Sequence, residues 1–377
     1  MTAFETIQKH YQQRNLAALE WKKNGGKVIG YFCNNVPEEL IMATGFFPLR
    51  ISGDPWEGTE VAEGYRMPYP LVAFVETMIN KLLTGKYDFL DYLVIPHARD
   101  QIWRLYTQLH FVAELDPQIK LPEIYFYDDL HTTFYTSSVY NRDRAIEFKK
   151  QLEKWSGKKI ANKALEKAIA VTNESKMLLK KVAALRAADT PRISGLEALQ
   201  IIGTSMFMQK EAHNTLLKDC LKGAESLPAR NGVRLFVESS PLDNLQFYEV
   251  VESCGAVVVG EDNCWGNRYS DVPIRQTLNP FESIVDRYLK KSPCPRMFPL
   301  QRRIDYCVRN AVESKAQGAL FHIYEGDNLQ AWEAPEEIKA LKATGMPVAY
   351  LKKQPYLLSG ADKEDLKTEI KEFIKTL

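Results

Sequence analysis

Residues able to do chemistry stand directly after a short apolar stretch near the start of the chain. Cys33 and Asn34 follow KVIGYF, and Glu38 and Glu39 come soon after, within VPEEL. A thiol at this place can act as a nucleophile or a metal ligand, because the start of a helix lowers its pKa. A buried carboxylate can serve as a general acid or base. Each also has a structural interpretation, in which the thiol is a small buried side chain and the glutamates stabilise a solvated first helical turn.

A second group of polar residues follows the apolar stretch FLDYLVIP. His97, Arg99 and Asp100 come directly after it. Arg99 can pair with Asp100, or it can bind a phosphate or an acyl carbonyl. In the second half of the chain, Glu325 and Asp327 follow GALFHIY in the same manner. We therefore treat the loops after these stretches as candidate linings of a site.

The cysteines form no recognisable metal or disulfide motif. They stand at positions 33, 220, 254, 264, 294 and 307, and none belongs to a C-x-x-C pair. In a chain of 377 residues without a signal segment, free thiols are expected. Cys264 in EDNCWGNRY and Cys294 in SPCPRM have the chemistry of metal ligands. Their spacing matches no compact metal motif, so a structural placement is the favoured interpretation.

The elements that position Cys33 form one β–α–β unit. Residues 27–32 are short, apolar and β-branched, which predicts a buried strand. Pro37 suits the first turn of a helix, and Gly45 ends that helix. Residues 48–52 are predicted to form a second strand. Because open parallel sheets bind ligands outside the carboxyl ends of their strands, Cys33 is expected at the binding edge.

The same order of elements occurs twice along the chain. Residues 141–224 are rich in Lys, Glu, Ala and Leu and predict helices only. The fold class is therefore α/β, with two similar parallel-sheet, three-layer domains of flavodoxin or Rossmann type joined by a helical segment. A small-molecule site is expected in the cleft between the two domains. The further predicted strands are 89–96, 122–127, 233–239, 256–260, 318–324 and 346–351, and the predicted domain boundaries are 1–140, 141–228 and 229–377.

Composition excludes several classes of function. The net charge of +1 gives no reason to expect nucleic acid or an anionic membrane as a partner. No apolar run reaches the ~18 residues that a membrane span needs. The first 26 residues predict a polar amphipathic helix without a signal core, so a cytoplasmic protein is expected. The sequence also lacks G-x-x-x-x-G-K-[ST], G-x-G-x-x-G and G-x-S-x-G.

Several of these segments together resemble the family of 2-hydroxyacyl-CoA dehydratase and benzoyl-CoA reductase subunits. Over nearly the whole chain, the resemblance is carried by the strand that runs into V-P-E-E-L and by FLDYLVIPHARDQIWRLY, VRLFVESSPLDN, GAVVVGEDNCWGNRY, SPCPRM and GALFHIYEGDNLQAWEAPEEIKAL. It implies a subunit of a CoA-thioester enzyme that works by low-potential radical electron transfer. Two related subunits pair in such enzymes, and a separate ATP-hydrolysing iron–sulfur activator supplies the electrons. The resemblance also implies a [4Fe-4S] cluster on three cysteines in the interdomain cleft of typical members.

This chain departs from the family at those three cysteine positions. The resemblance places them at Tyr69, Arg99 and Gly326, none of which can donate a thiolate. We therefore expect no metal on this chain, with the [4Fe-4S] cluster carried by partner subunits. The alternative is that other thiols replace the missing ligands, namely Cys33, Cys264 and Cys294.

The missing cysteines favour the branch of ATP-dependent, ferredoxin-linked benzoyl-CoA reductases, which convert benzoyl-CoA to cyclohexa-1,5-diene-1-carbonyl-CoA. This chain would help to form the acyl-CoA site of a heterodimer. The expected partners are a cysteine-complete paralogous subunit, the activator subunits and the acyl-CoA substrate. Two alternatives stay open, a 2-hydroxyacyl-CoA dehydratase subunit and a non-catalytic, structural or CoA-binding subunit.

The resemblance and the loop positions together assign roles to eight residues. Those expected to be catalytic are Cys33, Glu38, His97 and Arg99. Those expected to bind substrate are Tyr69, Asp100, Glu325 and Asp327.

Overall fold

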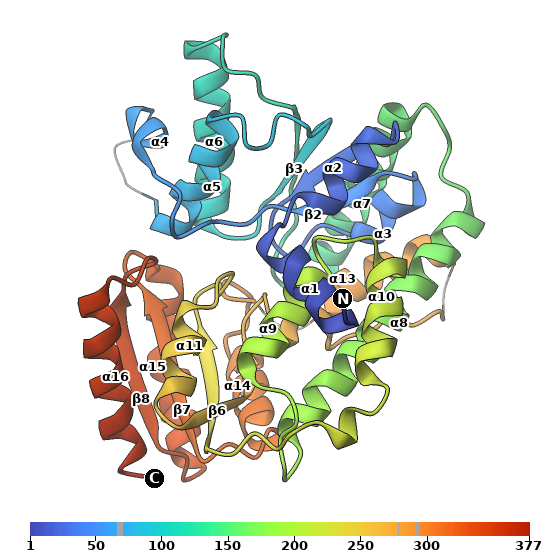
Figure 1. Cartoon of the computed structure of the whole chain (residues 1–377). Helices are drawn as coiled ribbons and strands as arrows, with labels where there is room; N and C mark the ends of the chain where they lie inside the picture. Colours follow the sequence, from blue (N-terminus) through green and yellow to red (C-terminus); the bar gives the residue numbers. More distant parts are fainter. Residues whose placement is uncertain (66–70, 278, 292–293) are drawn as a thin grey trace.

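Two four-stranded parallel sheets form the centre of the protein (Figure 1). We analysed a computed structural model, which describes residues 1–65, 71–277, 279–291 and 294–377. The first sheet, blue to cyan in Figure 1, lies above the second, which is yellow to red. The described strands are β1 (Val28–Tyr31), β2 (Phe47–Arg50), β3 (Tyr92–Pro96), β4 (Glu123–Tyr127), β5 (Val233–Ser239), β6 (Ala256–Asp262), β7 (Gly318–Tyr324) and β8 (Val348–Gln354).

The two sheets have the same strand order, which confirms the predicted repeat. The first runs β2-β1-β3-β4 and the second β6-β5-β7-β8. In the first sheet, Gly30 of β1 lies opposite Leu49 of β2 on one side and Leu93 of β3 on the other. A Cβ atom at Gly30 would come within 2.8 Å of the Leu90 side chain, so only glycine allows this close packing.

Helices cover both sheets and fill the space between them. In the first half they are α1 (Ala3–Gln12), α2 (Leu16–Lys23), α3 (Glu38–Ala43), α4 (Glu60–Gly64), α5 (Ala73–Leu83) and α6 (Asp100–Leu115). The middle segment forms α7 (Tyr135–Ser156), α8 (Asn162–Ala187), α9 (Gly195–Thr204), α10 (Lys210–Leu221) and the 3₁₀ turn η1 (Ala224–Ser226). The second half adds α11 (Gln246–Ser253), α12 (Asn267–Ser270), α13 (Pro280–Lys290), α14 (Gln301–Glu313), α15 (Asn328–Ala343) and α16 (Gly360–Ile374).

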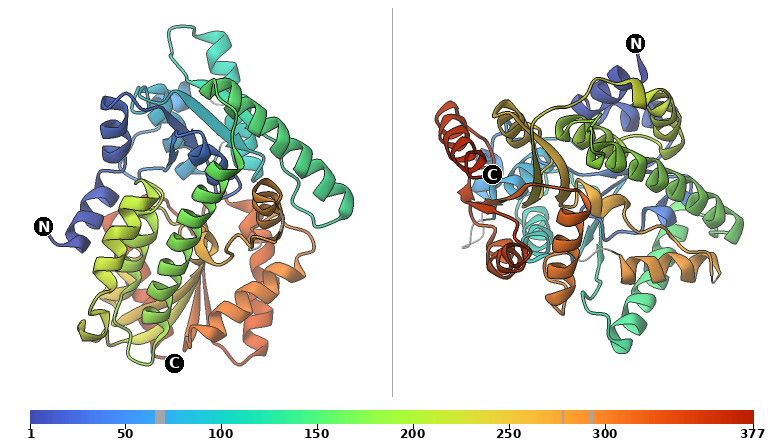
Figure 2. Two further views of the ribbon diagram at one scale, coloured as in Figure 1. Left: turned by 90° about the vertical axis from the view of Figure 1, so that its right-hand side faces the viewer. Right: turned by 90° about the horizontal axis from the view of Figure 1, so that it is seen from below.

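The middle helices join the two halves, as the sequence predicts. They also pack against elements of both halves. Helix α8 packs against α3 of the first half and against β6, α12 and α13 of the second. Figure 2 shows the green middle helices along one side of the molecule. The N-terminal segment forms two helices where one was predicted, and α1 packs on α9 and α10. No helix in the described part of the chain is long and apolar enough to cross a membrane.

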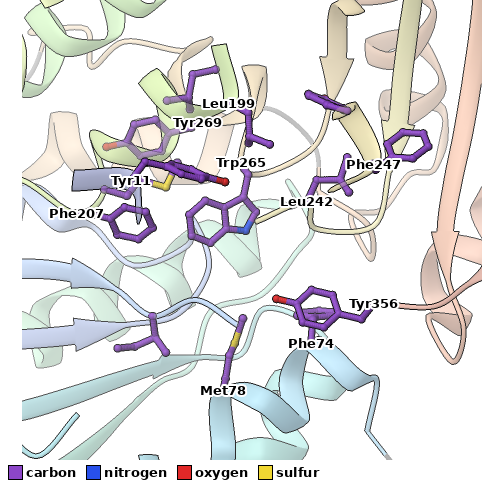
Figure 3. Close-up of a cluster of buried hydrophobic side chains, with 14 of the residues drawn as sticks. Tyr11, Phe74, Met78, Leu199, Phe207, Leu242, Phe247, Trp265, Tyr269 and Tyr356 are labelled. Carbon is purple, nitrogen blue, oxygen red and sulfur yellow. The ribbon is translucent and has the colours of Figure 1, made fainter. Parts of the chain in front are cut away.

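One continuous apolar core contains side chains from both sheets. In Figure 3, Phe74 and Met78 of α5 face Tyr356, Leu242 and Trp265 of the second half. The ring centroids of Phe74 and Tyr356 are 6.2 Å apart. The halves therefore share a buried interface, and the predicted domain boundaries stay a prediction.

Candidate functional site

The carboxyl edges of the two sheets face each other. The direction of the strand order reverses once in each sheet. The reversal lies between β1 and β3 in the first sheet and between β5 and β7 in the second. Loops at such a switch point form the ligand crevice of open α/β sheets. Here the loops after β1 and β3 meet the loops after β5 and β7, so two crevices merge into one site.

Arg99 and Asp327 join the two edges by a buried ion pair. The Arg99 Nη2 atom donates to Asp327 Oδ1, and their side chains are 8% and 0% exposed. The Ser240 hydroxyl donates to the other oxygen of Asp327 at 2.7 Å. Asp327 also accepts the Gln330 N–H at 3.4 Å and so caps α15. Two residues predicted separately, 228 positions apart, are thus in direct contact.

A cavity of about 40 Å³ lies beside this ion pair. A buried water needs roughly 10–15 Å³, so the cavity has room for about three. Loops from both halves line it, as the sequence predicts for an interdomain site. The lining residues are Cys33, Asn34, Asn35, Ala98, Arg99, Ser239, Pro241, Cys264, Arg268, Lys291, Cys294, Pro295 and Gln330.

Cys33 lines this cavity from a strained backbone. Its φ of 59° lies in the left-handed region, which is costly for a residue other than glycine. Burial raises the pKa of the Cys33 thiol to about 12, and the neighbouring thiol of Cys264 adds to the rise. The charges of Arg50 and Arg99 act in the opposite direction. In this state the thiol is protonated at neutral pH.

Arg50 binds Cys264 from across the interface. Its Nη2 atom lies 3.0 Å from Cys264 Sγ, and its Nη1 atom donates to the Cys264 carbonyl at 2.7 Å. The Asn34 amide donates to the same carbonyl at 2.8 Å. The Arg50 guanidinium also stacks over Trp265 at 3.9 Å. Contacts from the end of β2 and from the loop after β1 therefore hold the loop that carries Cys264 in place.

Glu38 and Glu39 are buried, so the solvated first turn considered above is wrong. Glu38 accepts hydrogen bonds from Tyr31 at 3.1 Å and Tyr269 at 2.8 Å, and it pairs with Lys210 at 3.1 Å. It does not line the cavity. The contacts of Glu38 show a side chain that ties α3 to both the middle helices and the second half.

Glu39 forms a second buried pair beside the first. It pairs with Lys176 of α8 at 3.2 Å and accepts the Tyr288 hydroxyl at 2.9 Å. Burial alone raises the pKa of the Glu39 carboxyl, but the charges of Lys176 and Arg287 outweigh it and hold that pKa at about 2. Neither lysine partner was predicted, because nothing in a lysine-rich helical sequence shows which side chain turns inward.

His97 lies next to the site without lining its cavity. Its Nδ1 is 2.7 Å from Asp128, and its Nε2 is 2.9 Å from Arg296 Nη2. Because an arginine can only donate, Nε2 is the acceptor and Nδ1 carries the proton toward Asp128. Asp100 and Glu325 are exposed and do not line the cavity. Tyr69 lies outside the described residues.

Sequence reasoning missed cations of the site, including Arg50 beside the cavity and Lys291 in its wall. Arg50 is 3% exposed and Lys291 is 6% exposed. A single arginine at the end of the apolar strand FPLR could have signalled a buried charge. Lys291 follows a helix that the sequence analysis did not assign, so it had no such signal.

The ligand set that the family resemblance implies for a [4Fe-4S] cluster does not fit the described structure. Arg99 stands at one of the three ligand positions, and its side chain pairs with Asp327. Gly326 offers no side chain at a second position. The buried carboxylates Glu238, Asp262 and Glu337 come close enough to hold an ion. However, Arg303 occupies that space, 3.1 Å from Glu238 and 2.8 Å from Glu337.

These features define a parallel α/β protein with two repeated sheets and one shared site at their facing edges. Residues 33–377 match the family model described as 2-hydroxyglutaryl-CoA dehydratase, D-component. The chain belongs to this family, which confirms the resemblance found in the sequence.

Similar proteins include both dehydratase and reductase subunits. The (R)-phenyllactyl-CoA dehydratase beta subunit of Clostridium sporogenes is 24% identical, over 98% of this chain and 94% of its own. A benzoyl-CoA reductase subunit of Thauera aromatica is 27% identical, over 73% of this chain and 72% of its own. The (R)-2-hydroxyglutaryl-CoA dehydratase subunit beta of Acidaminococcus fermentans is 22% identical, over 91% of each chain. The family therefore acts on acyl-CoA, and its members divide between two reaction classes.

Proposed function

We propose that this chain is a subunit of an ATP-dependent, ferredoxin-linked reductase complex that converts benzoyl-CoA to cyclohexa-1,5-diene-1-carbonyl-CoA. A paralogous subunit with the family's usual cysteines completes the acyl-CoA site. Separate ATP-hydrolysing iron–sulfur subunits deliver the electrons. A [4Fe-4S] cluster on the partner subunits supplies one-electron transfer to the acyl-CoA when it is bound.

The observation that carries this proposal is the Arg99–Asp327 pair, in which Arg99 stands at one family cysteine position and Asp327 directly follows another, Gly326. A subunit remodelled in this way depends on a partner for part of its chemistry. The match to the benzoyl-CoA reductase subunit of Thauera aromatica, at 27% identity, supports the reductase branch.

Within such a complex, the residues of this chain position and shape the site. Arg99 and Asp327 hold the two sheet edges at a fixed separation. The cavity of about 40 Å³ is far below the ~300 Å³ and more of ordinary ligand pockets, so the acyl-CoA binds outside it, against the partner subunit. In this proposal the exposed side chains of Asp100 and Glu325 contribute to that outer site.

A dehydratase subunit is the second candidate. It is favoured by the match to the (R)-phenyllactyl-CoA dehydratase beta subunit, which covers 98% of this chain. Such an enzyme removes water from a 2-hydroxyacyl-CoA and causes no net reduction of its substrate.

One reconstitution distinguishes the two candidates. The chain is produced together with a cysteine-complete paralogous subunit and the activator, and the complex is purified without oxygen. It then receives benzoyl-CoA or (R)-phenyllactyl-CoA, with ATP and reduced ferredoxin. We expect ATP-dependent formation of the cyclohexadiene product from benzoyl-CoA alone. Dehydration of the hydroxyacyl-CoA without reduction of benzoyl-CoA would establish the second candidate. No copurification and no turnover would reject both.

A further inference from the structure

One buried lysine in the wall of the cavity has no partner. Lys291 directly follows α13, is 6% exposed and lines the cavity. Within the described part of the chain it forms no ion pair and donates no hydrogen bond. Two other cations of the wall are paired, Arg99 with Asp327 and Arg268 with Asp262. Because a buried charge without an opposite charge is costly, an anion beside Lys291 would be stabilising.

No carboxylate in the described ranges pairs with this ammonium group. The charge of Asp129 acts on Lys291 from a distance, and the two side chains do not pair. Asp129 instead accepts a hydrogen bond from the Asn35 amide at 2.9 Å, and burial raises the pKa of its carboxyl. Burial lowers the pKa of the Lys291 ammonium, and the charge of Arg287 adds to that fall. The compensating charge therefore has to come from a ligand.

Other side chains of the wall carry polar atoms without a hydrogen-bond partner among the described residues. They are the Nε–H group of Arg99 and the hydroxyl of Ser239, which can donate, and the Oδ1 atom of Asn34. Arg99 and Ser239 are both buried. The Asn34 amide nitrogen donates to the Cys264 carbonyl at 2.8 Å, so Oδ1 is the acceptor of that side chain. The wall thus offers donors around a positive charge, together with an acceptor.

The size of the cavity and these polar groups define the ligand. At about 40 Å³ the cavity has room for about three waters, which excludes the acyl group and the nucleotide of a CoA thioester. An oxyanion with few non-hydrogen atoms fits this room and accepts hydrogen bonds from ammonium and guanidinium groups. An oxyanion that also carries a hydroxyl can donate to Asn34. Hydrogencarbonate has both properties, whereas formate has the acceptor oxygens and no hydroxyl.

We propose that this cavity binds hydrogencarbonate between the two halves of the protein. Its oxygens accept hydrogen bonds from Lys291, Ser239 and Arg99, and its hydroxyl donates to Asn34 Oδ1. These residues belong to the loops after β1 and β3, the end of β5 and the segment after α13. The bound anion joins the first half to the second and so stabilises the folded chain. This site is separate from the acyl-CoA site proposed outside the cavity.

The test uses the full chain alone, freed of dissolved carbon dioxide, at mildly alkaline pH and constant ionic strength. Thermal unfolding is followed while chloride is replaced by hydrogencarbonate or by formate. The unfolding midpoint should rise with hydrogencarbonate until the site is saturated, and it should rise less with formate. A midpoint no higher in hydrogencarbonate than in chloride would mean that only water occupies the cavity and would overturn the proposal. An equal or stronger response to formate would overturn the choice of hydrogencarbonate.

Two substitutions locate the site, with affinities measured by isothermal titration calorimetry. Lys291→Met should be at least as stable as the parent in chloride, because it removes an unpaired buried charge. It should bind hydrogencarbonate about tenfold or more weakly, because a charge-assisted hydrogen bond is lost. Ser239→Ala should weaken binding to a smaller extent. The matched control is Lys290→Met, which removes an exposed lysine that pairs with Asp286 and should leave the affinity unchanged. Unchanged affinity in Lys291→Met would overturn the proposal.

A second measurement uses the unmodified chain and avoids variants that fail to fold. Cys33, Cys264 and Cys294 line the same cavity, whereas Cys220 and Cys254 do not. An alkylating reagent, with mapping by mass spectrometry, should label the three cavity thiols more slowly in hydrogencarbonate than in chloride. Labelling of the other two should be the same in both salts. Equal labelling of the cavity thiols would place the anion elsewhere and reject this site. Because neither substrate nor partner is present, the result is independent of the proposed reaction.

Discussion

At the scale of residues, the ion pair between Arg99 and Asp327 shows what the sequence could and could not reveal. Both residues were candidates because each follows a buried strand. Their pairing could not be predicted, because it depends on how two separately folded edges meet. Cys33, Cys264 and Cys294 were named together only as an alternative ligand set, and the structure places all three at one cavity.

Arg99→Ala should destabilise the chain as well as weaken turnover by the complex. Removing one partner of a buried pair leaves the other charge uncompensated, at a cost of about 3–5 kcal/mol. In a double-mutant cycle with Asp327→Asn, urea unfolding should give a large coupling energy. The exposed pair Arg142–Glu282 at 2.6 Å is the control and should couple much more weakly. Equal coupling in the two cycles would show that Arg99 and Asp327 do not act as a buried pair.

Glu39 should make stability depend on pH at the acid side. Its pKa is about 2 in the folded state and about 4.5 when unpaired, so its contribution is present above about pH 4.5 and is lost as the pH falls toward 2. The contribution is about 3 kcal/mol. Glu39→Gln should therefore lower the free energy of unfolding at pH 7 and flatten its fall below pH 4.5. The exposed Glu147→Gln is the control, and an unchanged acid profile in Glu39→Gln would contradict this role.

At the scale of elements, strands were predicted better than helices. Residues 233–239 and 318–324 form strands with the predicted bounds, because buried parallel strands are short continuous apolar runs. The segment between β6 and β7 was left unassigned, yet it forms α12, α13 and α14. Its polar and proline-rich sequence hides helices whose stability comes from packing against α7, α8 and β6.

Helix α9 depends on its N-terminal cap. The Ser194 hydroxyl accepts the Glu197 N–H at 3.2 Å, and the Glu197 carboxylate accepts the Ser194 N–H at 2.8 Å. Ser194→Ala should cost about 1 kcal/mol in thermal or urea unfolding, because a first-turn N–H group loses its partner. Ser138→Ala, at a partly exposed position of α7 that caps no helix, should change stability little. A Ser194→Ala variant as stable as Ser138→Ala would show that the capping box is dispensable.

For the whole molecule, the repeat was predictable from the sequence, but the packing of its two halves against each other was not. Two sheets with one strand order follow from two similar series of elements. The shared core follows from contacts such as Phe74 with Tyr356, which no pattern within either half contains. The sequence predicts two domains with a cleft between them, whereas the structure has a packed interface with a small cavity inside it.

This shared core predicts that the halves unfold together. Urea unfolding should give one transition that is the same by circular dichroism and by tryptophan fluorescence, because neither sheet can expose its inner face without opening the other. Two separated transitions, or a protease-resistant half of the chain, would show that the interface contributes little to stability.

If the residues around the cavity shape the acyl-CoA site of the complex, turnover must depend on them. The most direct test compares Cys33→Ser with Cys220→Ser in the reconstituted complex, by ATP-dependent reduction of benzoyl-CoA. Thermal unfolding confirms that both variants are folded. We expect Cys33→Ser to lower the rate by about tenfold or more, equivalent to about 1.4 kcal/mol, and Cys220→Ser to leave it unchanged. Equal rates for the two folded variants would show that the residues around this cavity do not shape the active site.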